Sequence, residues 1–230
     1  MFCISITGKN LEEILTQVKK AEKEADILEL RLDYLEDKSF KNIEEVLKEV
    51  FQQKTKNMII TLRSKRQGGL YPNKYEDQVK VLLSACEIGY EYIDIELEWP
   101  SSIYKKIKKN KKDTKIIASY HNFKKTLTEY GLRKIARRLS YTHADILKIA
   151  TQANDYRNNL RIFDIIDFVK RRYKLETIAI CMGEKGKTSR VLTCSMGGFL
   201  TFACLDKNSI SAEGQMPIEE MKEVQKQLSL

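Results

Sequence analysis

Charged residues interrupt short apolar runs that otherwise resemble buried strands. The run from residue 28 to residue 32 reads Leu-Glu-Leu-Arg-Leu, which places Glu29 and Arg31 on one strand face and the leucines on the other. A later run separates Asp94 and Glu96 from isoleucines and leucine in the same way. Because buried charge is costly unless it is paired, these faces predict an ionic cluster inside the fold.

Cations occur in matching positions on other runs. Arg63 ends a run on the same face as Thr61, and Lys148 lies between two aliphatic residues. The sequence therefore predicts one paired set of acids and bases: Glu29, Asp94 and Glu96 against Arg31, Arg63 and Lys148. Half-exposed strands and a purely structural charge network are the alternatives.

Lys148 from this set, together with His121, offers the clearest catalytic chemistry. They lie on consecutive predicted strands, His121 at the end of one and Lys148 near the end of the next. A lysine that is removed from water near other cations loses its proton more readily, and the neutral amine can attack a ketone. A nearby histidine can move protons near neutral pH. The pair therefore favours imine chemistry, although a snorkelling lysine and a structural histidine remain the plainer interpretations.

Eight strand-like runs alternate with amphipathic segments and would position these residues. The runs are Phe2–Thr7, Ile27–Leu32, Met58–Arg63, Tyr92–Leu97, Lys115–His121, Asp145–Ala150, Thr177–Met182 and Phe199–Cys204. The helical segments include Leu11–Glu24, Ile43–Gln53, Asp77–Gly89, Leu127–Ser140 and Leu160–Arg172. Strict alternation predicts one (β/α)8-barrel domain over residues 1–230, with active-site residues at the carboxyl ends of its strands. An open doubly wound sheet is the alternative, but Gly8 alone is a weak phosphate-binding signal.

Composition narrows the class of protein. The chain has 230 residues, 42% of them hydrophobic, and only three prolines, which argues against disorder. No apolar run has the roughly 20 residues of a membrane span, and the amino terminus lacks signal-peptide features. We expect a cytoplasmic protein with no membrane partner, whose five cysteines are free thiols and bind no metal.

The formal net charge of +9 raises the question of a nucleic-acid partner. Much of this charge is lysine scattered over predicted helices, as in the run from residue 105 to residue 112, which we interpret as a solvated helix end and loop. Because no nucleic-acid motif accompanies it, we expect no nucleic-acid partner. A basic protein does favour a small anionic substrate.

Several spaced motifs together resemble those of the type I 3-dehydroquinate dehydratases. The most specific is Asp94-Ile95-Glu96-Leu97, followed after 18 residues by Ile116-Ile117-Ala118-Ser119-Tyr120-His121-Asn122. Others are Glu29-Leu30-Arg31-Leu32-Asp33, Thr61-Leu62-Arg63-Ser64, Asp145-Ile146-Leu147-Lys148-Ile149-Ala150, Ser189-Arg190 and Ser211-Ala212-Glu213-Gly214-Gln215. The resemblance covers essentially the whole chain.

The resemblance implies an enzyme that removes water from 3-dehydroquinate, in the shikimate pathway, without a cofactor. Lys148 would form the imine and His121 would act as general acid and base. Substrate binding would involve Glu29, Arg31, Arg63, Arg190, Ser211 and Gln215, with Met182 and Phe202 as apolar walls. Arg190 would meet the substrate carboxylate, and Met182 could equally be plain core. The resemblance also implies a homodimer.

Three features depart from the family pattern. Gln67 stands where many relatives have glutamate, so it can hold His121 by a hydrogen bond but supplies no negative charge. Glu213 replaces a proline of many relatives, which predicts a less stiff loop. The chain begins at its first predicted strand, without the hairpin that covers the barrel bottom in some relatives, so we expect other residues to cover that end.

Residues Leu205–Pro217 are polar and lie before a predicted final helix, Pro217–Gln227. By the resemblance this segment would be a lid that brings Ser211 and Gln215 onto the substrate; an ordinary surface connection is the alternative.

Two other functions remain open. A Schiff-base aldolase would share Lys148 but would usually need a glycine-rich phosphate site, for which Gly183, Gly186, Gly197 and Gly198 are weak candidates. A binding or scaffold protein without activity would form no imine.

Overall fold

Strands and helices alternate from end to end of the chain. The computed structural model describes residues 1–72 and 75–229, and within them it contains eight strands and eight α-helices. The strands are β1 (Phe2–Ile6), β2 (Ile27–Arg31), β3 (Asn57–Thr61), β4 (Tyr92–Glu96), β5 (Lys115–Asn122), β6 (Ile146–Gln152), β7 (Glu176–Met182) and β8 (Thr201–Ala203). The helices are α1 (Leu11–Ala21), α2 (Phe40–Gln53), α3 (Tyr75–Ile88), α4 (Ser101–Asn110), α5 (Glu129–Ser140), α6 (Asn158–Tyr173), α7 (Lys187–Leu192) and α8 (Ile218–Gln227).

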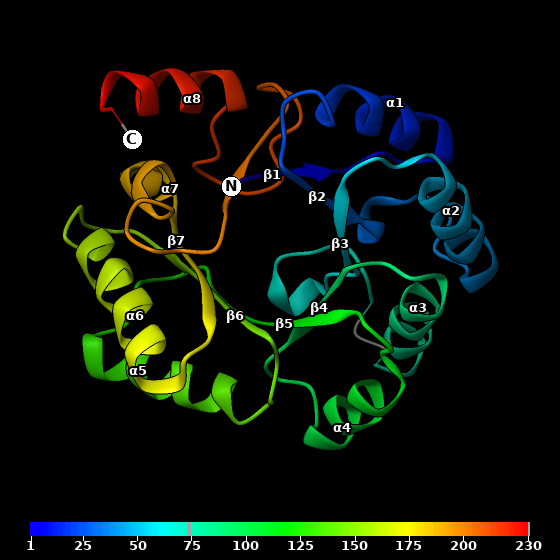
Figure 1. Ribbon diagram of the computed structural model, residues 1–230, viewed down its shortest axis with the longest axis horizontal. Coiled ribbons are helices and arrows are strands. Elements are labelled where there is room, and N and C mark those ends of the chain that lie inside the picture. The colour runs from blue at the N-terminus through cyan, green and yellow to red at the C-terminus, as the bar shows by residue number, and fades with distance from the viewer. Residues whose placement is uncertain (73–74, 230) are drawn as a thin grey trace.

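The strands form one parallel sheet in the order β7-β6-β5-β4-β3-β2-β1-β8. Just before β8, the backbone N–H of Phe199 donates to the carbonyl of Thr177 on β7 at 2.8 Å, which links the two ends of the sheet. The result is a nearly closed ring of strands surrounded by helices (Figure 1). The predicted (β/α)8 barrel is thus confirmed, and the open doubly wound sheet is wrong.

The period-two alternation of the strands separates two packing regions, as predicted. Leu28, Leu30, Ile93 and Ile95 point outward into the core between strands and helices. The other face points into the barrel, whose lower part is a separate apolar cluster formed mainly by Cys3, Ile27, Ile59, Tyr92, Ile117, Ile146, Ile178, Leu200 and Phe202. The ring of Phe199 packs against this cluster, 6.1 Å from the ring of Tyr92 between centroids. Apolar side chains therefore fill the lower interior, and the charges lie above them.

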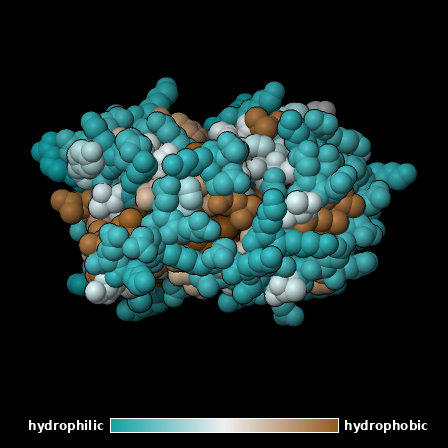
Figure 2. Space-filling model, turned by 90° about the horizontal axis from the view of Figure 1, so that it is seen from above, coloured by the Kyte–Doolittle hydropathy of each residue, from teal (hydrophilic) through white to brown (hydrophobic). Residues whose placement is uncertain are grey.

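Helices α1, α2 and α5 are amphipathic, and each begins at a side-chain cap. At α5, the side chain of Thr128 accepts a hydrogen bond from the backbone N–H of Gly131, an acidic residue occupies the first turn, and two arginines occupy the last turn. The buried residues of α5 recur at helical spacing and include Leu132, Ala136 and Leu139. The face of the molecule in Figure 2 is mostly hydrophilic, with hydrophobic side chains visible between polar ones.

For two helices, no bounds were predicted from the sequence. The short helix α7 carries Arg190, and α4 contains most of the lysine run. In α4, Tyr104 and Ile107 are buried while Lys105, Lys106, Lys108 and Lys109 are exposed, as expected for a solvated helix face. Across residues 1–72 and 75–229, none of the helices has the length and apolar character required to cross a lipid bilayer.

Candidate active site

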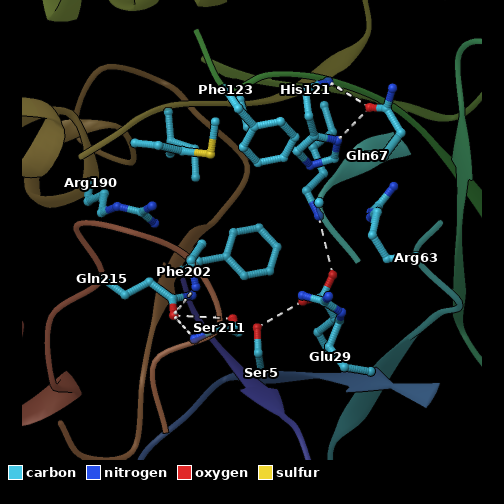
Figure 3. A pocket seen from close by; sticks show the side chains of 17 residues that line it. Ser5, Glu29, Arg63, Gln67, His121, Phe123, Arg190, Phe202, Ser211 and Gln215 are labelled. Carbon is cyan, nitrogen blue, oxygen red and sulfur yellow. Dashed lines mark hydrogen bonds and ion pairs between the residues drawn. The ribbon is translucent and has the colours of Figure 1, made fainter. Parts of the chain in front are cut away.

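Side chains from the carboxyl ends of the strands converge on a pocket above the apolar floor (Figure 3). The structure brings all ten predicted site residues to its wall: Glu29, Arg31, Arg63, His121, Lys148, Met182, Arg190, Phe202, Ser211 and Gln215. Their common location agrees with the active-site position of (β/α)8 barrels.

Lys148 lines the pocket and is 5% exposed. Its Nζ donates to Asp94 Oδ2 at 3.1 Å and to Glu29 Oε1 at 3.3 Å, and it lies 4.4 Å from the centroid of the Phe202 ring. The two carboxylates and the ring face all stabilise an ammonium group. The sequence predicted that other cations surround this lysine. The structure shows that its direct hydrogen-bond partners are two carboxylates.

Glu29 is held by hydroxyl groups as well as by Lys148. Ser5 Oγ donates to Glu29 Oε2 at 2.8 Å, and Thr61 Oγ1 donates to Glu29 Oε1 at 3.0 Å. Burial alone would raise the pKa of Glu29, but the nearby Lys148 and Arg31 lower it below its usual value. Glu29 is therefore an ionised acceptor that fixes the position of the lysine.

Arg63 forms ion pairs with two carboxylates of β4, Asp94 and Glu96. It contacts Asp94 Oδ2 at 2.7 Å and Glu96 Oε1 at 3.7 Å, and its Nη1 donates to Ser119 Oγ at 2.9 Å. Burial opposes ionisation of Asp94, yet Arg63 and Lys148 hold the pKa of this carboxyl well below its usual range. Asp94 thus bridges Arg63 and Lys148.

Arg31 departs from the predicted pairing. Its Nε and Nη2 donate to the two carboxylate oxygens of Asp33, each at 2.8 Å, and its guanidinium lies 5.0 Å from the Tyr34 ring centroid. Asp33 lies in the 3₁₀ turn Leu32–Tyr34 that follows β2. The guanidinium of Arg31 therefore forms its bidentate ion pair with a carboxylate only two residues away. The prediction that Arg31 pairs with Glu29, Asp94 or Glu96 is wrong.

His121 stands at the end of β5, beside Lys148's strand β6, as predicted. Gln67 Oε1 lies 3.2 Å from both the backbone nitrogen and Nδ1 of His121, and the Phe123 ring stacks at 6.0 Å between centroids (Figure 3). Burial of the ring, together with Arg63 and Lys148, lowers the pKa of His121 well below 6.5. The imidazole is therefore neutral at neutral pH and can accept a proton.

Arg190 is fully buried, projects from α7, and lines the same pocket. Its Nη2 donates to the carbonyl of Glu213 at 3.1 Å, but within the described residues its Nε and Nη1 have no hydrogen-bond partner. Burial lowers the pKa of Arg190 to about 10. Because a buried charge without a partner is unfavourable, this guanidinium is suited to an anionic ligand.

The segment before α8 forms the last wall. Gln215 Oε1 accepts hydrogen bonds from the backbone nitrogens of Ser211 at 2.8 Å and Ala212 at 3.2 Å, and from Ser211 Oγ at 3.2 Å. Glu213 attaches the segment to the barrel, since its carbonyl accepts from Gly183 N at 3.0 Å and its carboxylate from Gln152 Nε2 at 3.3 Å. Glu213 therefore makes contacts of its own, which the absence of a proline at this position did not predict.

Seven further residues line the pocket although they were not among the predicted site residues. They are Ser5, Gln67, Gly68, Phe123, Ala150, Ile180 and Ala212. Ser5, Ala150 and Ile180 share the inward face of their strands, a signal that the period-two pattern already contained. Phe123 is 48% exposed and follows a strand end, where no periodic signal identifies a pocket residue.

All five cysteines are free, as expected for unpaired thiols. In residues 1–72 and 75–229, no group of three or more His, Cys, Asp or Glu side chains is arranged to hold a metal ion.

Comparison with known proteins places this geometry in a family. The family described as type I 3-dehydroquinase matches residues 2–230. The 3-dehydroquinate dehydratase of Methanococcus maripaludis is 34% identical over 228 residues, which cover 98% of this chain and 99% of the relative. The chloroplastic bifunctional 3-dehydroquinate dehydratase/shikimate dehydrogenase of Arabidopsis thaliana is 35% identical over 96% of this chain, which spans only 36% of that protein.

A solved structure agrees with these matches. The type I 3-dehydroquinate dehydratase of Clostridium difficile, solved with covalently modified comenic acid, superposes with a TM-score of 0.90 at 26% identity. The match covers 99% of this chain and 91% of that one. With the family match over nearly every residue, and with the barrel and pocket described above, the chain belongs to the type I 3-dehydroquinase family.

Proposed function

We propose that this protein converts 3-dehydroquinate to 3-dehydroshikimate and water through an imine on Lys148, as a step of the shikimate pathway. The observation that carries the proposal is that two buried basic side chains, Lys148 and Arg190, line the same pocket. Lys148 can react with a ketone, and Arg190 has two unpartnered nitrogens that suit the carboxylate of the same substrate.

The reaction uses the groups in sequence. Lys148 attacks as a neutral amine, so it first gives up a proton to His121 and then adds to the ketone carbon. His121 returns that proton to the hydroxyl of the adduct, which leaves as water, and a protonated imine remains. This imine withdraws electrons, so His121 can remove a proton from the adjacent carbon. The electron pair then expels the hydroxyl group, which leaves as water after protonation by His121. Hydrolysis of the imine restores Lys148 and releases the product.

The surrounding charges support this cycle. Asp94 and Glu29 accept hydrogen bonds from Lys148 Nζ and so fix the position of the nitrogen that attacks. The same carboxylates then stabilise the positive charge of the iminium group, which occupies the place of the ammonium. His121, neutral because its pKa is lowered, is the available base in this pocket.

The glycines offer little support for an aldolase that binds a phosphorylated substrate. The backbone N–H groups of Gly183, Gly186, Gly197 and Gly198 already donate to carbonyls of Glu213, Gly183, Cys194 and Thr193, respectively. A phosphate cradle needs such groups to be free. The buried Arg190 favours a carboxylate-bearing ketone instead.

The proposal is tested by trapping. The protein is incubated with 3-dehydroquinate and sodium borohydride, which reduces an imine to a stable amine, and is then digested and measured by mass spectrometry. We expect an adduct on the peptide that contains Lys148, and none without substrate. Turnover without any trapped adduct would contradict the covalent route, and neither turnover nor adduct would contradict the proposed activity.

We further propose that the segment Leu205–Pro217 closes over the substrate. In the structure, Oε1 of Gln215 already accepts hydrogen bonds from the backbone of the segment. A bound ligand would therefore contact the amide nitrogen of Gln215 and the hydroxyl of Ser211. Hydrogen exchange of residues 209–216 should slow when product is bound, because the ordered segment opens less often. Residues of α5, remote from the pocket, provide the internal control. Equal exchange in both states would show that the segment is not a lid.

The same family membership supports a homodimer, and the free thiols support a reducing compartment such as the cytoplasm. Both are proposals.

A further inference from the structure

Gln67 is buried, and its side-chain amide lies between His121 and Glu98. It ends the 3₁₀ turn Lys65–Gln67 after β3, and its side chain reaches His121. On the other side, its Nε2 donates to Glu98 Oε2 at 3.1 Å. Glu98 follows β4 and is exposed, so the three side chains form a line from the surface to the pocket.

The contacts fix which end of the Gln67 amide faces His121. The backbone N–H of His121, 3.2 Å away, can only donate, so the atom opposite it must be the amide oxygen. An ionised Glu98 can only accept, so the atom opposite it must be the amide nitrogen. Two independent neighbours therefore require the same orientation.

This orientation also fixes the imidazole tautomer. Gln67 Oε1 lies 3.2 Å from Nδ1 of His121, and an amide oxygen can only accept. Nδ1 must then carry the hydrogen, because two lone pairs would otherwise face each other. In the neutral ring, the lone pair that can take a proton is left on Nε2.

We propose that Glu98, acting through the amide of Gln67, is a positioning residue that holds His121 as the Nδ1–H tautomer and leaves Nε2 as its basic nitrogen. The inference rests on the proposed function, in which His121 moves protons, and goes beyond it by placing a surface carboxylate in the proton-transfer machinery. Gln67 is neutral, so Glu98 contributes through the orientation of a hydrogen-bond chain and not through direct contact with the imidazole.

The chain has two histidines, which makes the tautomer directly measurable. We would record the ¹⁵N chemical shifts of the ring nitrogens by two-bond ¹H–¹⁵N correlation above pH 7, without substrate. His143→Asn assigns the signals, because His143 is exposed and its φ of 57° is one that asparagine tolerates. We expect a protonated Nδ1 and an unprotonated Nε2 for His121.

Glu98→Ala is the informative variant, since Glu98 is exposed and its loss should leave the fold intact. We expect the Nε2–H tautomer of His121 to appear and kcat to fall about threefold to tenfold, while KM changes less than twofold, a loss on the scale of one ordinary hydrogen bond. Glu98→Gln should recover most of the loss, because its amide oxygen can still accept from Gln67. Glu36→Ala, which removes an exposed carboxylate beyond β2, is the matched control.

Two results would overturn the proposal: an Nε2–H tautomer in the unaltered protein, or a Glu98→Ala variant whose tautomer and kcat are both unchanged. Because the tautomer is read without turnover, it remains a valid test even if the trapping experiment contradicts the proposed function.

Discussion

Lys148→Ala should lower turnover by more than a thousandfold, to below about a thousandth of the unaltered protein. Loss of a single transition-state hydrogen bond costs about 10²–10³ in rate, and a nucleophile takes part in several steps. Lys148 is the lysine in the wall of the pocket, so no other amine in this wall replaces it. The measurement is kcat for dehydration, combined with the borohydride adduct, which should be absent.

The variant should still fold, although less stably. Glu29 keeps its hydrogen bonds from Ser5 and Thr61, and Asp94 keeps Arg63. Removing one partner from a buried ion pair costs about 3–5 kcal/mol, and these remaining donors reduce that penalty. Circular dichroism and a melting curve distinguish a folded, inactive variant from an unfolded one.

Two further substitutions sharpen this test. Lys148→Met keeps an unbranched side chain of similar length without the amine and should be equally inactive, with less loss of stability. Lys65→Ala removes an exposed lysine just after β3 and should retain both turnover and adduct. Dehydration by Lys148→Ala above about a thousandth of the normal rate would count against the covalent mechanism.

His121→Ala should slow the reaction by about 10²–10⁴, the usual contribution of a positioned general acid or base. Lys148 remains in this variant, so an imine can still form slowly. Because His121 also assists proton transfers that make and break the imine, the covalent intermediate should accumulate. Mass spectrometry of quenched reactions would detect it. Near-normal turnover with no accumulated adduct would remove His121 from the mechanism, and His143→Asn is the control for a histidine outside the pocket.

The pH dependence follows from the direction of the His121 pKa shift. Burial and the neighbouring cations favour the neutral ring, so the pKa of His121 lies below 6.5 in the folded protein. A base must be unprotonated to act. The value of kcat/KM should therefore persist below pH 6.5 and fall only as pH drops through this lowered pKa. In His121→Ala that decline should disappear, whereas an apparent pKa above 6.5 in the unaltered protein would contradict the shift.

Much of the fold was predictable because the alternation of short apolar runs and amphipathic segments repeats eight times. Period-two patterning correctly assigned Glu29 and Asp94 to the barrel interior, since a strand cannot turn one side chain without turning its neighbours. It also correctly placed Lys148 and His121 on adjacent strands. The short helix α7 escaped prediction because six residues with one buried arginine give no helical period.

Pairing across the barrel was decided by the tertiary structure. Lys148 on β6 meets Glu29 on β2, although these strands are not neighbours in the sheet. Such a contact depends on closure of the ring and on the relative height of the strands, and neither is encoded in the period of a single strand. The local partner of Arg31 shows the converse: Asp33 is two residues away, but only the turn after β2 aims its carboxylate at the guanidinium.

The sequence by itself therefore determined the eightfold barrel, the inward charged faces and the two residues proposed for the chemistry, because each depends on local periodicity and residue type. Only the tertiary structure decided which carboxylates hold Lys148, that Arg190 is buried with unpartnered nitrogens, and how Gln67 joins Glu98 to His121. The physical reason is that ion pairing and hydrogen-bond direction depend on distances between atoms of separate elements, which are fixed only when the barrel closes and its loops pack.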